Sequence, residues 1–546
     1  MHRRLLLALG LAVVGASLFV AAAFAGSTGT ASSSKGAISK GGTLRIDYSL
    51  SDFEYVDPAL SYESAGWALL YAINQQLLNY PDKPGSAGGN QLQPEAATGF
   101  PVVSKDGKTY TFTVKSGIKF SDGSPLTAAA FARAIVRVCH PDMGSPAIAF
   151  STNFEGCQAY NEKKGNLTGV RAVGQKLTVK LVNPDPTFLS QISMPFFASV
   201  KPNMPINPKG ENVYPSTGPY RIVSREIGRS FVLERNKQYK GTRPNNPDRI
   251  VVTVNTDQNQ TLLRVKAGEA DLDMGGPPAA QIAALADEFG VNKTRFFVNP
   301  LVGTGYIALN TSRPTYGSVA RRQAVNYAID RPALLRTRGK FGGSRTDQIL
   351  APQLPGFKPA KIYPLGGAQP AKAKELLGGF SGEVNHLHTT SAAAQAHAQI
   401  VKYNLEQVGL KVNLKPQPFA VALSTMGNKG NEMDSFTIGW IADYFDPFDF
   451  INVLLDGTTI QETNNSNYAY FNDAKYNKLM KAAAKLSGQA RYTAYGNLDI
   501  DIMKNAAPWI PIFNYTSRDF VSARIENFIF HPVYGHPIFN ALAIKK

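Results

Sequence analysis

Alternating hydrophobic and polar positions recur along the chain at the two-residue period of a half-buried strand. Four such runs predict strands over Thr43–Ser49, Thr109–Val114, Lys176–Leu181 and Asp248–Asn255. Longer segments with an apolar face predict helices over Ser64–Leu78, Ala128–Val138, Ala392–Val408, Asp473–Lys485 and Gln489–Asn505. A predicted hairpin begins near Ser216, so not every strand is followed by a helix. The pattern predicts a mixed α/β fold rather than an uninterrupted parallel sheet.

The segment Ser435–Leu455 combines a short apolar run with three acids. Phe436–Ile441 is rich in β-branched and aromatic residues and is too short for a typical helix, so it predicts a buried strand. Asp446 precedes Pro447, and this pair predicts a helix N-cap followed by proline at the first helical position. Asp449 then falls in the first turn, where a carboxylate suits the positive end of the helix dipole.

Asp443 has no such local role. It follows the predicted strand, and its neighbours Trp440, Tyr444 and Phe445 are aromatic. A carboxylate in an apolar setting needs a cationic partner. Because no Lys or Arg occurs between positions 432 and 462, our hypothesis is that the partner of Asp443 is a ligand.

Length and the N-terminal pattern indicate an exported protein of several domains. A chain of 546 residues exceeds a single core and predicts about two to four domains. Arg3 and Arg4 precede an apolar stretch that ends in the cleavage pattern Ala23-Phe24-Ala25, so residues 1–25 are predicted to be a secretory signal peptide. An uncleaved membrane anchor is the alternative. Residues 26–40 are rich in small polar residues and predict a flexible tether.

Charge and hydropathy argue against nucleic acid as a partner and against a membrane-spanning helix after the signal peptide. The net charge of +17 arises from Lys and Arg residues that are scattered without a long basic run. We interpret it as surface adaptation rather than as a nucleic-acid-binding surface. No later segment has the roughly 18 apolar residues that a membrane-spanning helix needs, so we expect the mature chain to be soluble.

The sequence contains two cysteines, Cys139 and Cys157. Export to an oxidising space favours a disulfide between them. Closing a loop of this size is worth about 3 kcal/mol in the chain-entropy account. Two free buried thiols are the alternative.

Catalytic signatures are missing from the sequence. It contains no Gly-x-Ser-x-Gly, no His-Glu-x-x-His and no P-loop pattern. Of the seven histidines, His386, His388 and His397 form the one cluster, which we interpret as core or solvated residues in preference to a metal site. We therefore predict a binding protein with no cofactor, no catalytic residues and no metal. An exported hydrolase is the alternative from a different class.

Seven further segments occur in a fixed order between roughly residues 41 and 535. They are GGTLRIDYS with DPAL; QPEAAT with DGKTYTFTVKSGIKFSDGSPLTA; STGPYRIV with RSFVLERNKQY; RVKAGEADLD; ALNTSRP with RRQAVNYAIDR; GWIADYFDPFDFIN; and YFNDAKYNKLM. In order and spacing this set resembles the peptide-binding class of solute-binding proteins of ABC importers, which includes oligopeptide, dipeptide and nickel binders.

The resemblance implies a periplasmic-binding-protein-like fold of two lobes with a ligand cleft between them. Lobe I would be discontinuous and comprise residues 41–79, 213–297 and 509–546. A subdomain would be inserted at residues 80–212, and lobe II would comprise residues 298–508. The chain would cross between the lobes near positions 298 and 508, where it would form a hinge.

The resemblance also implies a role for the unexplained acid. In the family, an acid in the element that matches GWIADY pairs with the α-ammonium group of a peptide, and this position falls on Asp443. The implied ligand contacts are Asp443, Trp440 and Tyr444 on lobe II, and Tyr62, Ser64 and Ala65 on lobe I.

The implied partners are a peptide or other small solute and the transmembrane subunits of an ABC permease. The chain would act as a monomer in the periplasm or at the outer face of the cytoplasmic membrane. A non-peptide solute, such as an oligosaccharide, an opine-like compound or chelated nickel, is the alternative within the family.

Overall fold

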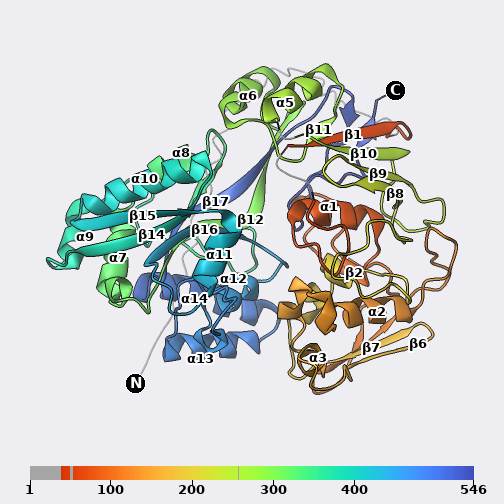
Figure 1. Ribbon diagram of the computed structural model, residues 1–546, viewed down its shortest axis with the longest axis horizontal. Coiled ribbons are helices and arrows are strands. Elements are labelled where there is room, and N and C mark those ends of the chain that lie inside the picture. The colour runs from red at the N-terminus through yellow and green to blue at the C-terminus, as the bar shows by residue number, and fades with distance from the viewer. Residues whose placement is uncertain (1–37, 50–52, 256, 546) are drawn as a thin grey trace, which may run out of the picture. The chain divides into compact units, whose positions relative to one another are not determined.

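Three sheets of four or more strands organise the computed structural model, which describes residues 38–49, 53–255 and 257–545 (Figure 1). The predicted signal peptide, residues 1–25, and most of the predicted tether, residues 26–40, lie outside these ranges. Within the described ranges, no helix is long and apolar enough to cross a membrane.

The first sheet has five strands in the order β11-β1-β10-β9-β8. They are β1 (Thr43–Tyr48), β8 (Tyr220–Glu226), β9 (Ser230–Arg235), β10 (Arg249–Val254) and β11 (Leu272–Asp273). Strand β1 runs parallel to β10 and β11, whereas β8, β9 and β10 are antiparallel neighbours. The hairpin predicted after Ser216 is the pair β8 and β9.

Helix α1 (Ser64–Ile73) contacts β8 and is shorter than the prediction, which extended it to Leu78. The buried side chain of Arg243 donates hydrogen bonds to the carbonyl oxygens of Tyr71 and Asn74. These bonds satisfy carbonyl groups that a helix leaves unpaired at its end, so the chain can leave the helix here. Arg243 lies far away in the sequence, and local periodicity could not reveal it.

The second sheet lies within the segment predicted to be an inserted subdomain. Its strands are β4 (Val102–Val103), β5 (Thr109–Thr113), β6 (Val170–Val173) and β7 (Lys176–Lys180), in the order β4-β5-β7-β6. Helix α2 (Ala128–Cys139) contacts β6 and β7. Cys139 at the end of α2 forms a disulfide with Cys157 at the start of α3 (Cys157–Asn161), so the two thiols are paired rather than free.

The third sheet has six strands in the order β13-β17-β12-β16-β14-β15. They are β12 (Phe296–Leu309), β13 (Gly343–Arg345), β14 (Gly382–Thr389), β15 (Leu410–Gln417), β16 (Ser435–Ile441) and β17 (Trp509–Phe520). Strand β14 is parallel to β15 and β16, and the other pairs are antiparallel. The strand predicted over Phe436–Ile441 is β16, one residue longer at its start. Its predicted burial is correct only for Phe436, because residues 437–440 are partly exposed and Ile441 is exposed.

Further helices and short strands complete the described fold. They are β2 (Leu78–Asn79), β3 (Gln93–Pro94), α4 (Phe188–Gln191), α5 (Gln258–Ala267), α6 (Ile282–Phe289), α7 (Val319–Ala328), α8 (Arg331–Arg336), α9 (Pro370–Leu377), α10 (Ala392–Glu406), α11 (Phe419–Gly427), α12 (Phe448–Leu455), α13 (Ala474–Ala484), α14 (Gly488–Asn505), β18 (Ile525–Glu526) and β19 (Ala543–Ile544).

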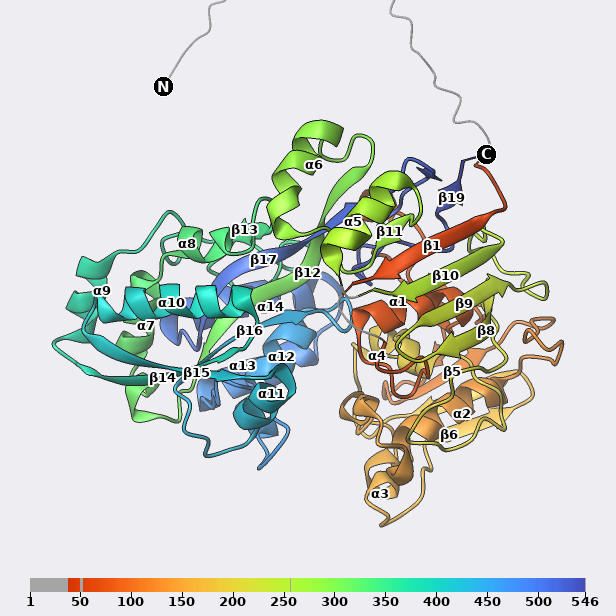
Figure 2. The ribbon, with the colours of Figure 1, turned by 45° about the horizontal axis from the view of Figure 1, so that its top comes forward.

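Strands β12 and β17 connect the first and third sheets (Figure 2). They pair along most of their length, from Phe296 with Phe520 to Ala308 with Trp509. Val521, which follows β17, bridges to Leu272 of β11 in the first sheet. Position 298 lies in β12 and pairs with Arg518, at the end of the ladder next to the first sheet. Position 508 directly precedes Trp509 at the opposite end, so the two predicted crossings do not lie side by side in this ladder.

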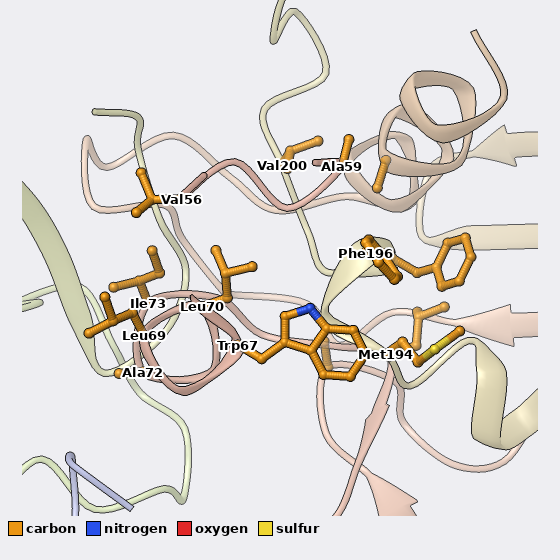
Figure 3. Packing of buried hydrophobic residues seen from close by; sticks show 14 of the residues in the cluster. Val56, Ala59, Trp67, Leu69, Leu70, Ala72, Ile73, Met194, Phe196 and Val200 are labelled. Atoms are coloured by element: carbon orange, nitrogen blue, oxygen red, sulfur yellow. The ribbon is translucent and has the colours of Figure 1, made fainter. Parts of the chain in front are cut away.

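Separate clusters of buried side chains accompany the first and third sheets. Figure 3 shows Trp67 of α1 close to Met194 and Phe196, part of the cluster that also includes the first-sheet residue Ile46. Tyr444 belongs to the same cluster although it follows β16 of the third sheet. The loop after β16 therefore inserts an aromatic side chain into the core of the neighbouring part of the molecule.

Candidate ligand-binding site

The loop between β16 and α12, together with the first turn of α12, holds the three acids that the sequence singled out. Asp446 accepts a hydrogen bond from the Phe448 main-chain nitrogen at 2.9 Å, as a residue that caps a helix does. The N-cap itself is Pro447, so the helix begins one residue later than predicted. Asp446 also forms a buried ion pair with Arg491 of α14, with an Nη2–Oδ1 distance of 2.9 Å. The ion pair explains this acid more fully than capping does.

Asp449 organises the loop. Its side chain is fully buried, and its Oδ2 accepts hydrogen bonds from Trp440 Nε1 and from the Asp443 main-chain nitrogen, both at 3.0 Å. Its Oδ1 has no hydrogen-bond partner among the described residues. Burial and the neighbouring Asp443 raise the pKa of Asp449 well above its usual value. The helix dipole alone, our explanation from sequence, is therefore incomplete.

Asp443 is half-buried, and no Lys or Arg forms an ion pair with it in the described part of the chain. Its Oδ2 accepts a hydrogen bond of 2.8 Å from the hydroxyl of Tyr62, which precedes α1. Burial raises the pKa of Asp443 to about 7. Two neighbouring carboxyl groups resist ionising together when no cation pairs with them, and no Lys or Arg of the described residues forms an ion pair with either of these two.

Tyr62, Ser64 and Ala65 line a cavity of about 460 Å³. The opposite walls come from Thr516–Asp519 of β17 and from the C-terminal segment Gly535–Phe539, among others. Asp443 does not line this cavity, and it lies one hydrogen bond beyond Tyr62. A larger cavity of about 640 Å³, beside Arg243, contains none of the residues that the sequence singled out.

Trp440 and Tyr444 do not line the 460 Å³ cavity. The half-buried indole of Trp440 is tied to Asp449. Tyr444 is only 1% exposed and packs edge-on against Phe150, with ring centroids 6.3 Å apart. In this structure the two aromatic residues therefore hold the Asp443 loop in place and do not face the 460 Å³ cavity.

Two residues of the histidine cluster, His386 and His388, lie on β14 of the third sheet, and the third, His397, lies on α10. His386 is buried, with Nδ1 2.8 Å from the Ser435 hydroxyl oxygen and Nε2 3.0 Å from that of Thr437. Burial lowers the pKa of His386 to about 3 and that of His397 to about 4. Among the described residues no group of three or more His, Cys, Asp or Glu could hold a metal ion. The contacts of His386 are those of a hydrogen-bonded core residue.

Sequence reasoning missed two partners of the acidic loop, Arg491 and the hydroxyl of Tyr62. Arg491 lies 45 positions after Asp446, and Tyr62 lies 381 positions before Asp443. No local spacing connects residues this far apart. The run without Lys or Arg was a usable signal, because no Lys or Arg of the described residues forms an ion pair with Asp443.

Comparison with known proteins places this geometry in a family. Residues 91–462 match the family described as bacterial extracellular solute-binding proteins, family 5 Middle. The oligopeptide-binding protein OppA of Bacillus subtilis is 24% identical over 496 residues, which are 87% of this chain and 88% of that protein. Heme-binding protein A of Haemophilus influenzae is 24% identical over 495 residues, which are 84% and 85% of the two chains.

Solved structures share the fold. The clavulanic acid biosynthesis oligopeptide binding protein 2 has a TM-score of 0.85 at 24% identity, with 93% of this chain and 96% of that chain covered. The Escherichia coli murein tripeptide binding protein MppA has a TM-score of 0.74 at 21% identity, with 93% and 99% covered. The chain thus has the two-lobed fold of these binding proteins. Because the family match spans more than half of its length, the protein belongs to family 5 of the bacterial extracellular solute-binding proteins.

Proposed function

We propose that this protein is the exported solute-binding component of an ABC importer, which captures extended peptides between its lobes and delivers them to a membrane permease. It acts as a monomer and does not chemically change its ligand. The names of its relatives support peptide as the solute, because several are called oligopeptide-, dipeptide- or tripeptide-binding proteins.

The observation that carries the proposal is an acid without a cation. Asp443 lies in the loop that follows β16, the strand that pairs with β12. This loop contacts Tyr62, which precedes α1, through the hydrogen bond between Tyr62 and Asp443. An α-ammonium group would supply the missing charge and would form a charge-assisted hydrogen bond there. Backbone hydrogen bonds along an extended ligand would add affinity without selecting particular side chains.

The first and second sheets support part of the lobe boundaries expected from sequence. We assign residues 41–79, 213–297 and 509–546 to lobe I, and residues 298–508 to lobe II. The first sheet falls within the lobe I segments, whereas the third sheet combines strands of lobe II with β17 (Trp509–Phe520), by which the chain returns to lobe I. Residues 80–212, which contain the second sheet, form the inserted subdomain. Strands β12 and β17 then serve as the hinge about which the lobes close on the ligand.

The test compares peptides and their N-acetylated forms by calorimetry on two charge-neutralising variants. Asp443→Asn is expected to weaken binding of free-amine peptides at least tenfold, because a desolvated ion pair is lost. Glu462→Gln, at an exposed side chain on the same lobe, serves as the matched control and is expected to bind as the wild type does. Equal affinity of the wild type for free and N-acetylated peptides would rule out the amine anchor.

A further inference from the structure

The Asp443 carboxylate already receives a hydrogen bond from within the protein. Tyr62 Oη lies 2.8 Å from Asp443 Oδ2, and the tyrosine hydroxyl is the donor, because an ionised carboxylate can only accept. Tyr62 belongs to the segment before α1, whereas Asp443 follows β16, so this bond joins the two lobes. Tyr62 also lines the 460 Å³ cavity, whereas its hydrogen-bond partner Asp443 does not.

The tyrosine is held in this position by packing. Its ring centroid lies 6.1 Å from that of Trp67, 6.2 Å from that of Phe150 and 5.5 Å from that of Phe196. Trp67 is itself fixed, because its Nε1 donates to the Ser61 carbonyl oxygen at 2.9 Å. Aromatic contacts of this kind orient the ring, so the hydroxyl meets Asp443 without a large loss of side-chain freedom.

We propose that Tyr62 is a built-in competitor of the ligand: its hydroxyl occupies the hydrogen-bonding position on Asp443 that the ligand's amine takes on binding. This inference rests on the proposed function, since it assumes that Asp443 is the amine anchor. It assigns Tyr62 the opposite effect on affinity from that of an ordinary ligand contact.

Competition sets a threshold for binding. A neutral hydroxyl on a ligand would exchange one O–H bond to the carboxylate for another and would gain little. An ammonium group brings a positive charge to an otherwise uncompensated carboxylate, so it displaces the tyrosine with a net gain. Tyr62 thereby lowers the affinity of neutral and cationic ligands by the same factor. A neutral solute is then left with little net binding, whereas an ammonium ligand keeps the gain from its charge.

The experiment is calorimetry on the full-length mature protein with Tyr62→Phe, which keeps the ring and removes the hydroxyl. The probes are tripeptides with an N-terminal alanine and the matching compounds with an N-terminal lactoyl group, in which a hydroxyl replaces the amine. In the variant, water takes the place of the tyrosine hydroxyl, so the expected gain in affinity is about three- to tenfold, the net worth of one hydrogen bond. Both probes should gain by the same factor, because both displace the same competitor.

The control is Tyr403→Phe at a tyrosine that is 63% exposed on α10, and its affinities should equal those of the wild type. Affinities are compared at the maximum of each pH profile, because loss of the hydrogen bond from Tyr62 raises the pKa of Asp443. Weaker or unchanged binding of the alanine peptides by Tyr62→Phe would overturn the proposal. So would a ligand-bound crystal structure in which Tyr62 still donates to Asp443.

These outcomes are separable from a failure of the proposed function. If Asp443→Asn abolishes binding and Tyr62→Phe weakens it, then the amine anchor stands and the competitor does not. If Asp443→Asn has no effect on peptide binding, both ideas fail together.

Discussion

The buried ion pair between Asp57 and Arg137 gives the most direct test of the packing around the site. Arg137 Nη1 and Nη2 donate to Asp57 Oδ1 and Oδ2 at 2.8 and 2.7 Å, and both side chains are fully buried. Asp57 also accepts hydrogen bonds from the main-chain nitrogens of Ala59 and Glu211. The pair joins α2 of the inserted segment to the loop that carries Tyr62.

Replacing Asp57 by Asn leaves the guanidinium of Arg137 buried without a counter-charge. Removal of one partner from such a pair typically costs about 3–5 kcal/mol, because the remaining charge is not solvated. The amide also has only one acceptor oxygen for the four donors that Asp57 now serves. We therefore expect Asp57→Asn to lower the free energy of unfolding by an amount within this range.

The assay is urea denaturation, followed by fluorescence and circular dichroism so that stepwise unfolding of the lobes is recognised. Asp142→Asn is the matched control, since Asp142 forms an ion pair with Lys163 in which both side chains are more than half exposed. It should leave the denaturation midpoint unchanged. If Asp57→Asn shifts the midpoint no further than Asp142→Asn, the reasoning about the buried charge is wrong.

Three further outcomes are expected. Gly496→Ala in α14 should destabilise the protein by about 1–3 kcal/mol, because the new methyl group overlaps a main-chain carbonyl oxygen of the adjacent loop. Gly427→Ala is the control: its methyl group has room, so the variant should be neutral or stabilising in thermal melts. Unreduced, denatured protein should show no reactive thiol, and reducing the bond between Cys139 and Cys157 should cost about 3 kcal/mol. Affinity for free-amine peptides should fall about tenfold per pH unit below 7, because Asp443 takes up a proton there and loses its charge. Calorimetry across that pH range measures the affinity, and a constant value would contradict the prediction.

Much of the fold follows from local pattern. The alternating segments are strands in the structure, and the apolar run before the acidic loop is β16 with a difference of one residue. The prediction was weakest where strands are long and cross between sheets. The segment from Trp509 to Phe520 forms one strand, β17, because pairing with β12 continues across the polar, turn-like composition at its centre.

The candidate site shows the same limit. Local rules identified Asp443 as an acid without a nearby cation. They placed Asp446 at the helix N-cap, whereas the N-cap is Pro447 and Asp446, one residue earlier, accepts a hydrogen bond from the Phe448 main-chain nitrogen. They could not supply Arg491 or Tyr62, since an ion pair or hydrogen bond between distant segments depends on how the sheets are brought together. The position of Asp449 in the first turn was correct, but its two hydrogen bonds arise from the way the loop folds back on itself.

The single disulfide has a practical consequence for following ligand capture. Both cysteines of the chain are used in it, so the oxidised protein offers no thiol to a reagent. A cysteine introduced at Ile441, which is 41% exposed and two positions before Asp443, would be the one site for a thiol-reactive fluorophore. Such a conjugate would convert movement of the Asp443 loop into an optical signal and would make the protein a reagentless sensor for its own solute.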